Sequence, residues 1–158
     1  MATPVLVQQG DGTNVSPVIP TVVDLSATSP SSATTSAQPP STGLGPYKSM
    51  LIYTELQGAT GGTLDVYLQV SPDNGTTWVD YAHFPQLAAA AAATKRLWSV
   101  SKHAQQTTLT TVGTGTNPAL AANSIVGGEF GDRIRVVFVS GSGTTLGAAQ
   151  VIKLILSP

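Results

Sequence analysis

The sequence contains no cysteine and few charged residues. Without cysteine, disulfides, thiolate nucleophiles and cysteine-bound metals are all excluded. Charged residues make up 9% of the chain, whereas an average soluble domain has about 25%. The formal net charge is −1, and the seven Lys and Arg residues are scattered. Because a phosphate backbone is bound by clustered cations, we expect no nucleic acid partner.

Long hydrophobic runs are also missing. No apolar stretch approaches the roughly 20 residues that cross a bilayer as a helix, so we expect no membrane partner. Met1 to Val5 lack the basic segment and apolar stretch of a signal peptide, which predicts a protein made in a cytoplasm. The two histidines, His83 and His103, lack the spacing that places two metal ligands on one element. The sequence therefore predicts no metal and no cofactor.

Hydroxyl side chains take the place of the missing charges. Serine and threonine supply 36 of the 158 positions, 15 Ser and 21 Thr. Threonine is favoured in β-strands, and a chain of this length forms one domain with a substantial core. So little charge suits a concentrated free monomer poorly. We interpret the composition as that of a β-protein that docks on its neighbours.

The chain after residue 47 predicts a series of strands. Every second residue from Leu64 to Val70 is apolar and shares one face, which is typical of a half-buried antiparallel strand. Similar patterns predict strands at 50–56, 77–84, 133–139 and 149–156, the last two paired across Gly141–Gly143. The six alanines at 88–93 favour helix by propensity, but their flanks favour a loop leading into a strand at 96–100. The predicted fold class is all-β, an antiparallel β-sandwich or jelly-roll.

Residues 1–46 differ from the rest of the chain. Short apolar clusters, Val5–Val7 and Val18–Leu25, are interrupted by prolines, and residues 26–45 are almost entirely Ser, Thr, Ala, Pro and Gly. Such a segment buries too little apolar surface to offset its ordering entropy. We therefore predict an extended N-terminal arm over residues 1–46 and a β-sandwich domain over residues 47–158. The arm either adds a strand to a neighbouring subunit or is a flexible tail.

The sharpest local motif is the segment Ser71–Trp78, SPDNGTTW. It matches the Asp-box pattern S-x-D-x-G-x-T-W of sialidases and other propeller proteins, in which the motif stabilises a hairpin away from the catalytic residues. Aspartate and asparagine cap turn amides, and glycine tolerates a positive φ. The sequence therefore predicts a structural hairpin, with the tryptophan folded over the turn, formed by Ser71, Asp73, Gly75, Thr77 and Trp78.

Two further groups of residues are candidates for binding or chemistry. Asp65 and Tyr67 lie opposite the apolar stripe of residues 64–70, so we predict that they form an exposed contact surface. The acidic residues lie in separate strands and turns, no serine lies in a G-x-S-x-G elbow, and no glycine-rich segment has the lysine of a phosphate loop. We therefore predict no catalytic residues and no enzymatic activity. The strand aromatics either fill the core or stack on a sugar: Tyr53, Tyr67, Trp78, Tyr81 and Trp98.

The segment Thr63–Phe84, TLDVYLQVSPDNGTTWVDYAHF, followed later by Gly131–Val136, resembles a recurring type of small tailed-phage virion protein. The likeness extends over residues 48–157 and leaves out the N-terminal segment. It implies a β-sandwich component of the virion, such as a capsid decoration (cement) protein, without catalytic residues.

On this resemblance we expect a structural protein on the capsid surface of the virion, made in the host cytoplasm, that binds and stabilises the assembled capsid. Its partner would be the major capsid protein of the same particle. We also expect a homo-oligomer, with a trimer favoured by the symmetry of a head lattice. The alternative is a carbohydrate- or receptor-binding β-sandwich component of a phage tail or spike.

Overall fold

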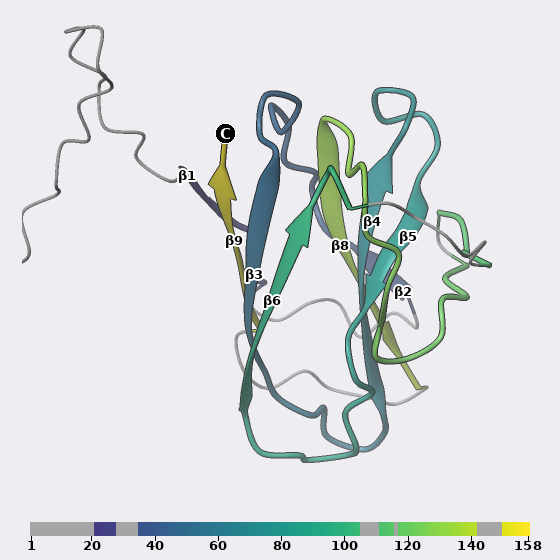
Figure 1. The fold of residues 1–158 in the computed structure, drawn as a ribbon. Coiled ribbons are helices and arrows are strands. Elements are labelled where there is room, and N and C mark those ends of the chain that lie inside the picture. Colours follow the sequence, from purple (N-terminus) through teal and green to yellow (C-terminus); the bar gives the residue numbers. More distant parts are fainter. Residues whose placement is uncertain (1–20, 28–34, 105–110, 116, 142–149) are drawn as a thin grey trace, which may run out of the picture.

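The computed structural model describes residues 21–27, 35–104, 111–115, 117–141 and 150–158. Within these ranges the chain forms nine strands and no helix. The strands make two antiparallel sheets that face each other, one on the left and one on the right of Figure 1. The predicted all-β sandwich is therefore confirmed.

The four-stranded sheet has the order β1-β9-β3-β6. Its strands are β1 (Thr21–Asp24), β9 (Val151–Ser157), β3 (Ser49–Leu56) and β6 (Thr94–Ser101). β3 lies inside the sheet and pairs along its whole length with β6 and over Ser49–Glu55 with β9. All neighbours are antiparallel, so alternate residues of each strand face the second sheet.

The five-stranded sheet has the order β2-β8-β4-β5-β7. Its strands are β2 (Thr35–Ala37), β8 (Arg133–Ser140), β4 (Leu64–Ser71), β5 (Val79–His83) and β7 (Ser124–Ile125). β4 pairs with β8 over its whole length, whereas its ladder with β5 shifts register between Leu68 and Gln69. The shift is a β-bulge with Tyr81 as the extra residue, which turns this ring into the core.

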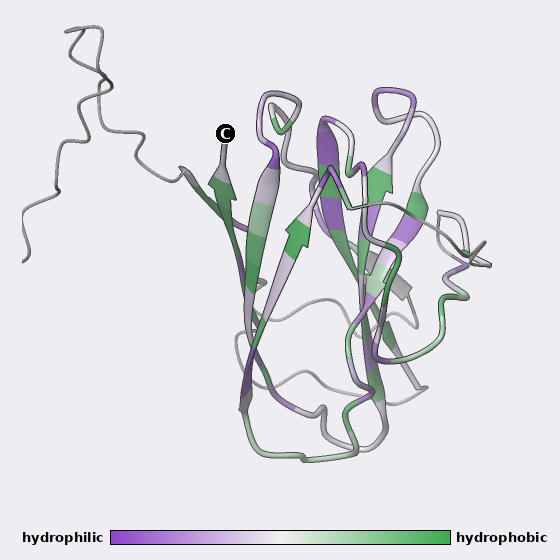
Figure 2. Ribbon diagram, viewed as in Figure 1, coloured by the Kyte–Doolittle hydropathy of each residue, from purple (hydrophilic) through white to green (hydrophobic). Residues whose placement is uncertain are grey.

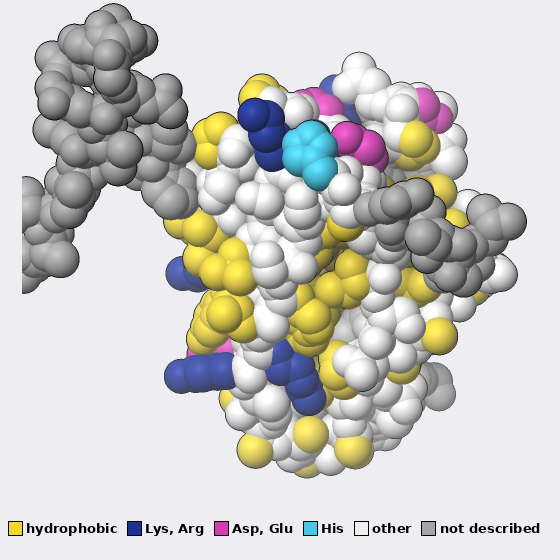
Figure 3. Space-filling view, viewed as in Figure 1, with side chains coloured by type: hydrophobic (Ala, Val, Ile, Leu, Met, Phe, Trp, Pro, Cys, Tyr) yellow, Lys and Arg dark blue, Asp and Glu magenta, His cyan; other side chains and the backbone are white. Residues whose placement is uncertain are grey.

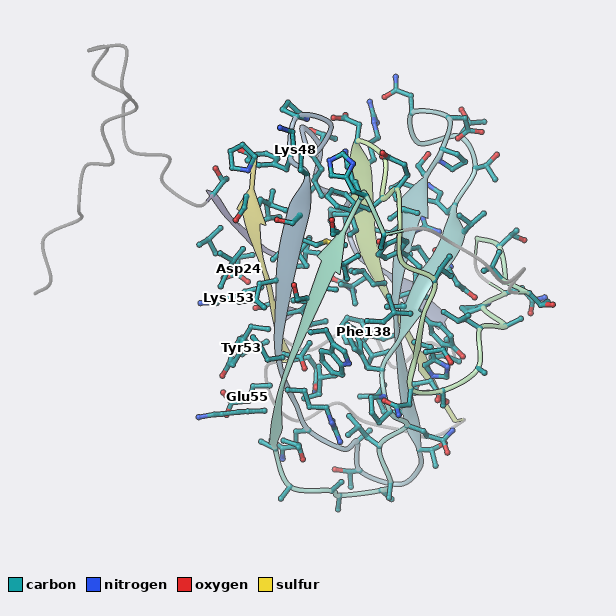
Figure 4. All side chains as sticks on the ribbon, in the orientation of Figure 1. Asp24, Lys48, Tyr53, Glu55, Phe138 and Lys153 are labelled. Atoms are coloured by element: carbon teal, nitrogen blue, oxygen red, sulfur yellow. The ribbon has the colours of Figure 1, made fainter. Side chains whose placement is uncertain are left out.

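The hydrophobic core fills the space between the two sheets. The inward-facing side chains of the inner strands β3 and β4 are buried, among them Met50, Ile52, Leu56, Leu64, Val66 and Leu68. β8 and β9 contribute alternate residues in the same way, and Figure 4 places Phe138 of β8 between the sheets. Figure 2 shows hydrophobic stretches along the strands of both sheets. The period-2 alternation in the sequence is therefore the property that builds the core.

The predicted pairing of residues 133–139 with residues 149–156 is wrong. β8 pairs with β4 and β2, whereas β9 pairs with β3 and β1, so the two strands lie in different sheets. Most of the predicted turn between them falls on residues 142–149, which lie outside the described residues. Alternation identifies a strand but does not say which sheet it joins, because pairing depends on contacts that are distant in sequence.

The structure moves the boundary predicted between residues 46 and 47. β1 is the outer strand of the four-stranded sheet, and its ladder along β9 continues through Leu25 and Ala27. β2 and Ser41 lie along β8, and Leu44 is fully buried. Residues 21–27 and 35–46 therefore belong to the sandwich, because backbone pairing at a sheet edge needs little apolar surface. Of the predicted arm, residues 1–20 and 28–34 lie outside the described residues.

Truncation of Leu44 tests whether this segment is part of the fold. Leu44 is fully buried, so Leu44→Ala should lower the free energy of unfolding by about 2–5 kcal/mol through lost burial and a residual cavity. Val22→Ala, at a β1 side chain that is 56% exposed, is the matched control and should change it by about 0.5 kcal/mol or less. Urea denaturation measures both values. Equal stability of the two variants would mean that the segment is not docked.

Candidate functional site

The Asp-box segment forms the turn between β4 and β5. The Ser71 hydroxyl accepts a hydrogen bond from the Gly75 backbone N–H at 2.6 Å and donates one to the Asp73 carboxylate at 3.0 Å. The same carboxylate oxygen accepts a hydrogen bond from the Thr77 backbone N–H at 2.6 Å. Asn74 and Gly75 have positive φ angles of 62° and 100°, and these are the residue types that tolerate such angles. The predicted hairpin residues thus hold the turn together.

Trp78 folds back over this turn. Its indole N–H donates a hydrogen bond to the Gly75 carbonyl oxygen at 3.1 Å, and the side chain is largely buried. The guanidinium of Arg135, on β8, lies 4.4 Å from the ring centroid, a distance typical of a cation–π contact. Burial lowers the pKa of Arg135 from its usual value. The turn is therefore attached to the neighbouring strand through its tryptophan.

Acidification should weaken the hairpin through Asp73. Hydrogen bonds from Thr77, and one from Ser71, hold the pKa of Asp73 below its ordinary value of 3.8. A carboxylate with a lowered folded-state pKa stabilises the fold above the unfolded-state value, and this contribution is lost as the pH falls through the folded-state value. The melting temperature should therefore fall on acidification to pH values below about 4. The fall should be smaller in Asp73→Asn, and an identical fall in thermal unfolding of both proteins would contradict this role.

A second polar cluster is centred on Asp80 of β5, whose side chain is almost fully buried. One carboxylate oxygen, Oδ2, accepts hydrogen bonds from the backbone N–H groups of Gly113, Ala119 and Leu120, at 2.9, 2.8 and 3.0 Å. The other oxygen accepts one from the side-chain amide of Gln69 at 2.9 Å. These bonds hold the loop that follows residue 111 against the outer side of the five-stranded sheet.

Gln69 connects this cluster to the hairpin. Its side-chain oxygen accepts two hydrogen bonds from the Arg135 guanidinium, at 3.0 and 2.8 Å, and its amide donates one to the Gly115 carbonyl oxygen at 2.8 Å. Because Arg135 also lies over Trp78, the loop, β4, β8 and the hairpin share one network. The sequence placed Asp80 only among scattered acids. No local signal identifies it, since its partners lie 11 to 40 residues away.

Asp80→Ala should release the loop. The substitution leaves three backbone N–H groups without their acceptor, and each buried unsatisfied group costs about 1–3 kcal/mol. We expect a loss of about 3 kcal/mol or more in the free energy of unfolding, together with faster hydrogen exchange at Gly113, Ala119 and Leu120. Asp24→Ala, at an exposed carboxylate on β1, is the control. Unchanged exchange rates at these three amides would show that Asp80 does not hold the loop.

The exposed contact surface predicted from Asp65 and Tyr67 is not found. Tyr67 is 7% exposed, and its ring stacks on His83 with the centroids 3.9 Å apart. His83 Nε2 lies 3.0 Å from the Asp65 carboxylate and its Nδ1 lies 2.7 Å from the Leu120 carbonyl oxygen. Burial, with a smaller effect of the Asp65 charge, raises the pKa of Tyr67 to about 12. The loop around Leu120 covers this face, which strand alternation does not anticipate.

The aromatic side chains considered as a sugar platform are dispersed. The Tyr81 ring is buried and its hydroxyl donates a hydrogen bond to the Gly128 carbonyl oxygen. Trp98 is partly buried and lies against Phe84, with ring centroids 5.1 Å apart. Tyr53 lies on the outer side of the four-stranded sheet. The five aromatics named from the sequence therefore do not share a surface.

The outer face of the four-stranded sheet carries exposed apolar side chains. We define this face by the outward residues of its strands, which form rows across β1, β9, β3 and β6. One row consists of Val22, Ile155 and Leu51. The next row consists of Asp24, Lys153, Tyr53 and Leu97. Val22 and Leu97 are the most exposed large hydrophobic residues of the described part of the chain, at 56% and 60%.

Charges on this outer face occur in opposite pairs. Lys153 lies 3.9 Å from Asp24, and Lys95 lies 3.9 Å from Glu55. Figure 4 shows Asp24, Lys153, Tyr53 and Glu55 pointing away from the second sheet. In Figure 3, hydrophobic side chains lie along the left margin of the molecule, with cationic side chains projecting among them. The face is therefore apolar in part and close to neutral.

A sequence signal for this face exists but is ambiguous. β9 carries apolar residues on both sides, because Val151 and Ile155 face outward on either side of Lys153 while Ile152, Leu154 and Leu156 face the core. Such a strand is buried either between two layers of its own chain or against a partner. Only the structure distinguishes these cases, by leaving the outer side uncovered in the described part of the chain.

Groups able to hold a metal are not found in the part of the chain that the structure describes, where no three His, Cys, Asp or Glu side chains converge. Within the same residues, no helix is long and apolar enough to cross a membrane. His83, Asp65, Asp73 and Asp80 hold turns, loops and strands in place. The absence of catalytic residues, metals and cofactors stays a prediction.

Comparison with known proteins provides no relative. No protein-family model, no curated protein and no solved structure matches this chain. Function must therefore be inferred from the geometry of the outer face and from the resemblance of residues 63–84.

Proposed function

We propose that this chain is a non-enzymatic structural protein of a tailed-phage virion that binds and stabilises the assembled capsid as a decoration protein. Its partner is the major capsid protein of the same particle, and it acts on the capsid surface. The observation that carries the proposal is the outer face of the four-stranded sheet, which is partly apolar, close to neutral and uncovered by the described part of the chain.

The contrast between the two sheets supports a partner on this face. The outer side of the five-stranded sheet is covered by the chain itself, where Leu120 packs with Tyr67 and Val137. The corresponding side of the four-stranded sheet leaves Val22 and Leu97 largely exposed. Large exposed apolar patches on a soluble protein are typical of interaction sites. Apolar side chains interspersed with opposite charges in pairs are compatible with a protein interface, which combines apolar and polar area.

The low charge of the chain fits a permanent place on a lattice. A decoration protein binds the assembled shell in preference to free subunits and stabilises the shell by mass action. Such a protein reaches a high local concentration on the particle and does not need the charge that keeps a free monomer soluble. The resemblance of residues 63–84 to small virion proteins supports the same placement.

The alternative function, a carbohydrate- or receptor-binding component of a tail or spike, has weaker support. Stacking on a sugar requires exposed aromatic rings, whereas Tyr67, Trp78 and Tyr81 are buried. An enzyme also has weaker support, because the carboxylates of Asp73 and Asp80 accept hydrogen bonds from backbone N–H groups.

A charge introduced on the outer face tests the proposal. Val22 is 56% exposed, so Val22→Lys should fold normally while placing an unpaired cation in the docking surface. We expect the substitution to weaken binding to expanded heads about tenfold or more, equivalent to about 1.4 kcal/mol. Ala89→Lys, which adds the same charge in an exposed loop away from this face, should bind as the unmodified protein does. Co-sedimentation with purified expanded heads measures the affinity, with unexpanded proheads for comparison.

The outcomes separate the parts of the proposal. Saturable binding at a fixed ratio per capsid subunit, weakened only by Val22→Lys, supports decoration through this face. Equal loss or equal retention of binding in the two variants would assign the contact to another surface. Absence of binding to both kinds of shell would overturn the decoration function itself.

A further inference from the structure

We propose that β6 pairs with β6 of a second copy of this chain, antiparallel and centred on Leu97, so that two four-stranded sheets join into one continuous sheet. The inference concerns self-association and does not depend on the proposed binding to a capsid. It rests on the open edge of β6 and on the residues along it.

β6 is a long edge strand without a described neighbour on one side. It pairs with β3 over all eight of its residues and in a continuous register, and the described part of the chain supplies no strand beyond it. Figure 1 shows β6 as the last strand of this sheet. The edge strands of the other sheet, β2 and β7, have three and two residues. A long regular edge exposes unpaired backbone N–H and C=O groups that can pair with another chain.

The protection of this edge is confined to one end. Charged residues and prolines on an edge strand discourage pairing with other chains. Lys95 and Arg96 lie near the start of β6, whereas residues 97–101 have no charge, no proline and no glycine. Leu97, at the boundary between the two halves, is 60% exposed. The second half of the strand is therefore available to a partner strand.

Two-fold symmetry restricts how two copies of β6 can pair. Identical antiparallel strands are related by an axis perpendicular to the sheet, which runs between the strands, midway between the same residue of the two copies. An axis at Arg96 would oppose two guanidinium groups, and an axis at Ser99 would oppose Arg96 and Lys102 of the second copy. Like charges directly opposite each other destabilise a sheet. An axis at Leu97 avoids both, because it places Lys95 opposite Ser99 of the second copy.

The register centred on Leu97 also provides a partner for Arg96. In this register Arg96 lies opposite Trp98 of the second copy, on the side of the sheet that faces the core. One guanidinium nitrogen of Arg96, Nη1, is buried without a hydrogen-bond partner, and a guanidinium over an indole ring gains a cation–π contact. An axis at Trp98 would instead place Arg96 opposite Val100. Charge and aromatic complementarity thus select Leu97, and the result is a dimer in place of the trimer expected from the sequence.

Cysteine scanning tests both the association and its register. The chain has no cysteine, so Leu97→Cys and Ser99→Cys each contain a single thiol at an exposed position. In the proposed pair, the two residues 97 lie opposite each other with Cα atoms about 4.5–5.5 Å apart, within the range of a disulfide. The two residues 99 lie about four residues apart along the strands, about 13 Å.

We expect mild oxidation to cross-link Leu97→Cys more than tenfold faster than Ser99→Cys, and sedimentation velocity to show a dimer of the unmodified protein. Equal rates would indicate random collision, and faster cross-linking of Ser99→Cys would indicate another register; either result overturns the proposal, as does a purely monomeric protein. Val22→Lys, at the opposite edge of the sheet, should leave the dimer intact. A failure of self-association is therefore distinguishable from a failure of capsid binding.

Discussion

Asp80 carries a carboxylate that is almost completely removed from water, and an anion in that position is stable only where its oxygens receive hydrogen bonds. Three backbone N–H groups of one loop and the amide of Gln69 meet this requirement. The loop is thereby held over Tyr67. Gln69 also accepts hydrogen bonds from Arg135, whose guanidinium lies over the ring of Trp78. One buried anion thus joins the hairpin, the central strands and the covering loop.

This covering loop makes the two sides of the sandwich different. Behind it, the outer side of the five-stranded sheet becomes a second small core of Tyr67, Leu120 and Val137. The four-stranded sheet has no such cover in the described part of the chain, so Val22 and Leu97 remain in contact with water. The ion pairs beside them are exposed and stabilise the fold little. Their consequence is a neutral, partly apolar face, which is suited to a protein partner.

The same sheet presents two distinct binding features. We propose that a capsid covers the side chains of its face and that a second copy pairs with its free edge at β6. The two features meet at Leu97 on β6, whereas Val22 on β1 belongs to the face alone and lies at the opposite edge of the sheet. A dimer formed through β6 would double the area of the face and allow each dimer to contact two sites at once. Such bivalent binding strengthens attachment without a new kind of contact.

The sequence by itself determined the local features: the alternation from Leu64 to Val70, the loop that leads into β6 and the positive φ at Gly75. Each of these depends on neighbouring residues alone, through strand periodicity or the steric freedom of glycine. Only the tertiary structure decided that β8 and β9 lie in different sheets, that β1 and β2 belong to the sandwich, and that Tyr67 is buried. Strand partners and covering loops are chosen by contacts between distant residues, and no local pattern encodes them.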